Sequence, residues 1–259
     1  MKKRTYYVMA AMLAIVAVSF VFLTRRDSQT PQAVYSADKF LVVGTSDDYP
    51  PYTFSQDGKV VGFDIDLVQE VAQRMGRFLI LKTMAFDILL LELQRGTIQI
   101  IAAGLTPTTG RAQKVLFTSP YISGDPLLAV TRAEDQIVHS LAQMQGKTVV
   151  VNEGYTADFY LSAYPQLHLE KRETVAECLL SLERYKADVY VVAQSAYQPF
   201  LKTKGAAHFR THPLSDVTEK YALAVSKKYP LLFEKVEEIV RELREDGTID
   251  DLKKRWDLA

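Results

Sequence analysis

The chain has 259 residues, 48% of them hydrophobic, which is enough for one large core or two smaller ones. Its 31 basic and 31 acidic residues cancel, and a neutral chain without a long basic run lacks the positive surface that binds nucleic acid. The single cysteine, Cys178, excludes an internal disulfide, and the four histidines show no metal-ligand spacing. We therefore expect no nucleic-acid partner and no metal or other cofactor.

The first 37 residues differ in chemistry from the rest. Basic residues at positions 2–4 precede an apolar run over residues 8–23, and a polar stretch follows over residues 24–31. This pattern predicts that residues 1–37 are an export signal peptide, or a retained N-terminal membrane anchor, plus a linker. Export with cleavage is favoured, and both alternatives put the globular part outside the cytoplasm, in the periplasm.

Strand and helix patterns alternate along the rest of the chain. Apolar runs predict strands at residues 39–44, 60–63, 78–83, 98–102, 127–131, 146–151, 189–193 and 221–225. Helical spacing of apolar residues predicts helices at 65–75, 88–95, 157–163, 179–184, 229–243 and 249–256. Asp64 and Asp87 stand where they could cap two of these helices, and Thr156 or one of its neighbours could cap a third. The alternation predicts an α/β protein.

A helix-turn-strand unit occurs twice in the sequence. Residues 90–102 are echoed at 179–191, some ninety residues later. Repetition of such a unit suggests two lobes of similar construction.

The stretch 98–111 combines a strand pattern with the chemistry of an anion site. Ala103 and Gly104 let a ligand approach the backbone, Thr106 offers a hydroxyl, and Arg111 offers a planar fork that matches a carboxylate. Open α/β sheets usually bind ligands at the carboxyl ends of their strands, where this stretch begins. The alternative is a strand followed by a capped turn and a surface arginine.

Six short motifs resemble one protein family in their order along the chain. They are Gly62–Leu67 (GFDIDL), Gly44-Thr45, Tyr49–Tyr52 (YPPY), Thr106–Thr108 with Arg111, Phe117–Tyr121 (FTSPY), and Asp246–Thr248 (DGT) before Trp256. Residues 39–256 thereby resemble the family-3 extracellular solute-binding proteins, the amino-acid binding proteins of ABC importers, and most closely their arginine-binding members.

The resemblance implies a type II periplasmic binding protein fold with two lobes, each a sheet flanked by helices. Lobe 1 would comprise residues 39–122 and 218–259, and lobe 2 residues 123–217. The lobes would close on one amino acid, L-arginine or another polar or basic one, and deliver it to an ABC permease in the inner membrane. The protein would act as a monomer.

The resemblance also implies roles for individual residues. Arg111 would bind the ligand α-carboxylate with help from Gly104 and Thr106, and Tyr49 and Phe86 would flank the ligand side chain. The full expected set of ligand-binding residues is Ser46, Asp47, Tyr49, Phe86, Ala103, Gly104, Thr106, Arg111, Asn152, Glu153, Thr156 and Gln194.

Two positions depart from the family pattern. Ser46 stands where many relatives have an aspartate, and Ala193 stands where they have the aspartate that receives the α-ammonium group; Gln194 is the nearest polar substitute. A buried guanidinium then needs another acid. Asp47, Asp48 and Glu153 are candidates, with Asp47 slightly favoured, and stacking on the two aromatic rings alone is the alternative.

Proteins with this fold also have other functions. Some relatives are periplasmic dehydratases, but the chain has no Gly-x-Ser-x-Gly motif, no metal set and no evident histidine base among the site residues, so we do not expect an enzyme. A ligand-sensing or surface-adhesion protein is the other alternative, favoured if the N-terminal segment is retained.

Overall fold

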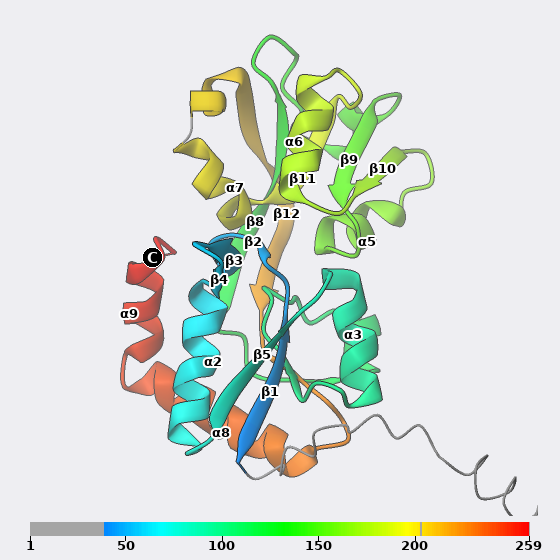
Figure 1. Ribbon diagram of the computed structural model, residues 1–259. Helices are drawn as coiled ribbons and strands as arrows, with labels where there is room; N and C mark the ends of the chain where they lie inside the picture. Colours follow the sequence, from blue (N-terminus) through cyan, green and yellow to red (C-terminus); the bar gives the residue numbers. More distant parts are fainter. Residues whose placement is uncertain (1–38, 203, 259) are drawn as a thin grey trace, which may run out of the picture. The chain divides into compact units, whose positions relative to one another are not determined.

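The computed structural model describes residues 39–202 and 204–258, so the predictions for residues 1–37 lie outside it. Two five-stranded sheets, each with its own helices, form the described part (Figure 1). This confirms the predicted α/β class and the two sheet-containing lobes. No helix among the described residues has both the length and the apolar character needed to cross a bilayer.

The first sheet has helices on both faces. Its strands are, in hydrogen-bonded order, β5 (Phe78–Thr83), β1 (Phe40–Thr45), β6 (Ile100–Ile101), β13 (Ala224–Val225) and β7 (Leu116–Phe117). Alternate residues of β1 point to opposite faces. Leu41 and Val43 belong to the apolar cluster that contains α2 (Phe63–Arg74), whereas Val42 packs in the cluster of α3 (Phe86–Arg95). The two helices therefore cover opposite faces of the sheet (Figure 1).

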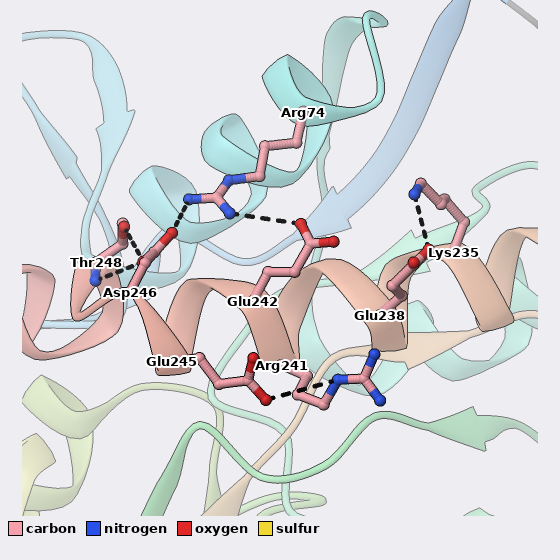
Figure 2. A network of polar contacts seen from close by, with 8 residues as sticks. All are labelled: Arg74, Lys235, Glu238, Arg241, Glu242, Glu245, Asp246 and Thr248. Carbon is pink, nitrogen blue, oxygen red and sulfur yellow. Dashed lines mark hydrogen bonds and ion pairs between the residues drawn. The ribbon is translucent and has the colours of Figure 1, made fainter.

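Two C-terminal helices complete this lobe on the side of α2. α8 (Pro230–Glu245) and α9 (Thr248–Arg255) both contact α2. Arg74 of α2 donates to Glu242 (3.5 Å) and to Asp246 (2.5 Å), as Figure 2 shows. Asp246 also accepts from the Thr248 backbone N–H at 3.0 Å, and Gly247 between them has a φ of 84°. The Asp-Gly-Thr motif thus makes the sharp turn between two helices.

The second sheet carries the other half of the chain. Its strands are, in order, β10 (His168–Arg172), β9 (Thr148–Asn152), β11 (Val189–Ala193), β8 (Ile122–Arg132) and β12 (Phe209–Tyr221). The remaining elements are α5 (Thr156–Ser162), α6 (Val175–Glu183), α7 (Gln194–Leu201), the 3-10 helices η1 (Leu141–Met144) and η2 (Lys204–His208), the short α4 (Thr109–Ala112), and a small sheet of β2 (Asp48–Tyr49), β3 (Thr53–Gln56) and β4 (Lys59–Val61).

Two long strands carry the chain between the sheets. β8 and β12 pair antiparallel from Ile122↔Tyr221 to Arg132↔Phe209. At the end nearer the first sheet, the Ala222 N–H donates to the Leu105 carbonyl at 3.1 Å. The boundaries predicted at residues 122/123 and 217/218 fall inside these two strands, and we propose that the lobes meet there.

None of the three helices predicted to have a side-chain cap has one. α2 begins at Phe63 and α3 at Phe86, so Asp64 and Asp87 lie inside the first turns; α5 begins at Thr156, and its N-cap has no side-chain hydrogen bond. In α2 the loop supplies the missing acceptors: the Pro51 and Tyr52 carbonyls accept from the first N–H groups of the helix. These tertiary hydrogen bonds satisfy N–H groups that a side-chain cap would otherwise satisfy.

Some of the predicted strand bounds match the structure and others do not. β5 and β11 match residues 78–83 and 189–193, whereas the predicted strand 221–225 is divided between β12 and β13, in different sheets. The sequence pattern did not predict α7 or most of β12. The burial of β12 depends on pairing with β8, which lies some ninety residues earlier, so its own pattern is weak.

We expect Gly62→Ala to lower the free energy of unfolding by roughly 3 kcal/mol or more. Gly62 has a φ of 136°, and an added Cβ would lie 2.1 Å from the Tyr52 carbonyl oxygen. Gly58→Ala is the matched control, because Gly58 also has a positive φ (73°) but nothing within 4 Å of the added Cβ. It should cost only about 1–2 kcal/mol. Urea denaturation measures both; equal losses would contradict a special role for the Tyr52 contact.

Candidate functional site

Arg111 is a buried cation that links the loops of the two sheets. It lies in α4, and the Thr108 hydroxyl accepts from its backbone N–H at 3.3 Å. Its guanidinium donates from Nη1 to the Thr106 carbonyl (2.8 Å) and from Nη2 to the Gly154 carbonyl (2.6 Å). The residue is only 6% exposed, and burial lowers its pKa to about 10, so it stays charged at neutral pH.

Aromatic rings and a cavity surround the same guanidinium. The Arg111 Cζ lies 5.6 Å from the Phe86 ring centroid and 5.2 Å from that of Phe159. Arg111 lines a cavity of about 310 Å³ whose walls are mainly apolar and include residues of both lobes: Phe86, Leu89, Leu105, Glu153, Gly154, Phe159 and Lys171. A planar cation in such surroundings can receive a carboxylate through two hydrogen bonds with little competition from water.

Three aromatic side chains meet where the sequence predicted two. Tyr49 is buried in β2, and Phe86 begins α3. The Tyr155 ring contacts both, with its centroid 5.0 Å from that of Tyr49 and 4.4 Å from that of Phe86. A ligand side chain between Tyr49 and Phe86 would therefore have to contact or displace Tyr155, which the sequence analysis did not select.

The Tyr155 hydroxyl is an unpaired polar group. Tyr155 is 8% exposed, and its phenol oxygen has no hydrogen-bond partner in the described part of the chain. Burial raises the pKa of the phenol, and the nearby carboxylates of Asp48 and Glu219 raise it further. The hydroxyl therefore points into a region that two acids share.

Gly104 is fixed by its neighbours. Its φ is 57°, and an added Cβ would lie 2.6 Å from the Tyr49 ring, so only glycine fits here. Its N–H donates to the Asp64 carboxylate at 2.7 Å, and the Tyr121 hydroxyl donates to the same oxygen. Burial raises the pKa of Asp64 to about 7. The Gly104 N–H is thus engaged inside the protein, and Asp64 positions the loop beside Arg111.

Two buried acids on the connecting strands were not found from the sequence. Glu219 of β12 is 4% exposed, and its Oε2 accepts from the Thr106 hydroxyl at 2.9 Å. Burial raises its pKa to about 7, while the Arg111 charge acts in the opposite direction. Asp125 of β8 accepts from the Ser195 backbone N–H (3.1 Å), the Ser195 hydroxyl and the Tyr221 hydroxyl (2.9 Å). The apolar residues of β12 do not alternate, so its sequence gave no signal that Glu219 is buried.

A second cavity is strongly acidic. Its volume is about 280 Å³, and five carboxylates line it together with Met84, Ala85, Phe86 and Thr174: Asp47, Asp48, Asp87, Glu153 and Glu173. Asp48 is the most buried of these acids, and its Oδ1 has no hydrogen-bond partner among the described residues. Burial raises the Asp48 pKa, and the charges of Asp47 and Glu173 add to the rise. A cation in this cavity would relieve the repulsion between the acids.

The structure brings most of the predicted residues together, but not all. Phe86 and Glu153 line both cavities described above, Arg111 lines the first and Asp47 the second. Gln194 is exposed and lines a different cavity, of about 240 Å³, with Tyr52, Asp125 and Ser195. Gln194 and Arg111 thus do not share a cavity.

Four other predicted residues have partners inside the protein or no polar contact with the cavities. The Asn152 Oδ1 accepts from the Tyr190 hydroxyl at 2.6 Å, so this amide is held in the second lobe. The Ser46 Oγ lies 3.4 Å from the Thr53 Oγ1, and Ala103 is buried without a polar side chain. Thr156 is half-buried at the start of α5. Their contact with a ligand stays a prediction.

Comparison with known proteins shows that one family matches most of the chain. The model of the bacterial extracellular solute-binding proteins, family 3, matches residues 41–258. The probable ABC transporter arginine-binding protein ArtJ of Chlamydia trachomatis serovar D is 31% identical over 228 residues, which cover 86% of this chain and 87% of that protein.

Solved structures agree with this assignment. A mutant of ArgBP from T. maritima has a TM-score of 0.77 and 32% identity, and the match covers 84% of this chain and 94% of that one. The ancestral amino acid-binding protein AncCDT-1, a precursor of cyclohexadienyl dehydratase, has a TM-score of 0.75 and 26% identity, with coverage of 84% and 95%. The protein therefore belongs to the bacterial extracellular solute-binding proteins of family 3.

Proposed function

We propose that this protein captures L-arginine between its two lobes and delivers it to an ABC importer in the inner membrane. One observation carries the amino-acid part of the proposal: Arg111 is buried, charged and hydrogen-bonded to loops of both lobes. A ligand carboxylate that replaces the Gly154 carbonyl on Nη2 would make a charge-assisted hydrogen bond in its place. The ligand would then bridge the lobes and favour their closed arrangement.

The acidic cavity favours a ligand with a cationic side chain. Its five carboxylates come from both lobes, and Phe86 lies on its wall as well as beside Arg111. A ligand anchored by its carboxylate at Arg111 could thus extend past Phe86 toward the acids. A guanidinium against an aromatic ring contributes about 0.5–2 kcal/mol. The names of similar proteins, among them an arginine-binding protein at 31% identity, agree with this choice.

Membership of an extracellular solute-binding family implies an extracytoplasmic location. We further propose that the protein is periplasmic, that it acts as a monomer, and that it is not an enzyme. The likeness to a dehydratase precursor makes an enzyme the alternative. No histidine lines the three cavities described above.

A thermal-shift panel of the common L-amino acids tests the proposal. At a concentration one hundred times the dissociation constant, a ligand adds about 2.7 kcal/mol to the stability, which corresponds to a Tm increase of roughly 5–10 °C. We expect the largest shift with L-arginine, a smaller one with L-lysine or L-glutamine, and none with D-arginine. The proposal fails if no amino acid raises Tm.

Arg111→Ala should lower the affinity for L-arginine by roughly 30-fold or more, because the ligand carboxylate would be desolvated without its partner. Arg111→Lys keeps the charge but loses the planar fork, so it should recover only part of the affinity. Titration calorimetry measures both variants, and circular dichroism checks that they fold. Wild-type affinity in Arg111→Ala would assign the carboxylate to another group.

Asp48→Asn should weaken L-arginine by about 10-fold or more and leave L-glutamine nearly unchanged, because a guanidinium in the acidic cavity would lose its most buried acid. Asp47→Asn and Glu153→Gln are the controls, since both side chains are exposed. The sequence favoured Asp47, and the same calorimetry tests that prediction. Small, equal losses in all three variants would leave the aromatic rings as the source of selectivity.

A further inference from the structure

The family aspartate that would hold the ligand α-ammonium is missing from its expected position. Ala193 occupies that position, and the neighbouring Gln194 lines a cavity that Arg111 does not share. The carboxylate and ammonium of an α-amino acid are attached to the same carbon. An acid that receives the ammonium must therefore lie within a few ångströms of the arginine that receives the carboxylate.

Thr106 joins such an acid to Arg111. The Thr106 carbonyl accepts from Arg111 Nη1 at 2.8 Å, while the Thr106 hydroxyl donates to Glu219 Oε2 at 2.9 Å. Thr106 thus forms hydrogen bonds to both a buried guanidinium and a buried carboxyl group. Among neighbouring charges, that of Glu219 raises the Arg111 pKa the most. The Arg111 charge in turn lowers the Glu219 pKa and so favours the ionised form of Glu219. The two ionisable groups are thus connected through a single residue, Thr106.

The other buried acid nearby does not fit this role. Both oxygens of Asp125 are occupied: Oδ1 accepts from the Ser195 N–H, and Oδ2 from the Ser195 and Tyr221 hydroxyls. The Asp125 charge is not among those that shift the Arg111 pKa, and Asp125 lines the same cavity as Gln194. Asp125 therefore holds α7 against the connecting strands rather than a group beside Arg111.

We propose that Glu219 binds the α-ammonium group of the ligand while Arg111 binds its α-carboxylate, so that a connecting strand supplies the acid that position 193 lacks. This role rests on the proposed function. It makes recognition of the amino-acid end depend on β12, which also carries the chain between the lobes. Separation of the lobes would expose Glu219, and closure on a ligand would bury the new ion pair.

The test pairs a change in the protein with the matching change in the ligand. The probes are L-arginine and 5-guanidinopentanoic acid, which is arginine without its α-amino group. Glu219→Gln should weaken L-arginine by roughly 30-fold or more and 5-guanidinopentanoic acid by less than about threefold. Glu237→Gln is the matched control, because Glu237 also accepts from a hydroxyl, that of Ser119, but lies in α8. It should change neither affinity.

Proton release gives a second measurement that a purely structural role would not affect. Burial raises the pKa of Glu219 to about 7 and the Asp125 charge adds to the rise, whereas Thr106, Tyr221 and Arg111 lower it. Near pH 7 part of the free carboxyl population is therefore protonated, and binding of an ammonium should release protons. Affinity for L-arginine should then fall as the pH drops below 7. Calorimetry in buffers of different ionisation enthalpy measures this release, which Glu219→Gln should abolish.

The outcomes separate the two proposals. Failure of the wild-type protein to bind L-arginine would overturn the proposed function and this role with it. Wild-type binding of L-arginine combined with equal losses for both ligands in Glu219→Gln would overturn only the role of Glu219. Unchanged proton release in that variant would do the same.

Discussion

A charged guanidinium buried between two lobes is the constraint on which the site depends. Arg111 is 6% exposed, and a buried charge is costly unless it is paired and hydrogen-bonded. The chain meets this requirement with two backbone carbonyls, one from each lobe, and with the nearby carboxylate of Glu219. The same contacts leave a planar donor that an incoming carboxylate can take over, so the group that needs compensation is also the group that we propose recognises the ligand.

The surroundings of Arg111 are held by groups that need not touch a ligand. Asp64 accepts the Gly104 N–H and the Tyr121 hydroxyl, and the absence of a side chain at Gly104 lets the Tyr49 ring lie against the backbone. Asp64 belongs to a family motif and was predicted from the sequence as a helix cap. In the structure its buried carboxylate instead holds the loop at Gly104 in place. This arrangement keeps the donor geometry rigid, which reduces the entropy lost when a ligand binds.

Charge is distributed along the cleft in a way that matches a cationic amino acid. Glu219 and Arg111 are connected through Thr106. Phe86 lies beside Arg111 and also on the wall of the acidic cavity with Asp48, and its ring contacts that of Tyr155. Acids that repel one another at close range are stabilised by a cation, and the effect is stronger where water is scarce. Binding and lobe closure are therefore favoured by the same electrostatic relief.

The sequence by itself determined the α/β class, most of the strand and helix positions, and the key arginine, because apolar periodicity and a short motif are local signals. Tertiary structure alone decided the helix starts, where the carbonyls of Pro51 and Tyr52 replace a side-chain cap, and the inward direction of Tyr155. It also decided that Glu219 lies beside Arg111. The two residues are 108 positions apart, and only the pairing of β8 with β12 brings a polar strand into the interior, where burial gives an ordinary glutamate its raised pKa and its proposed role.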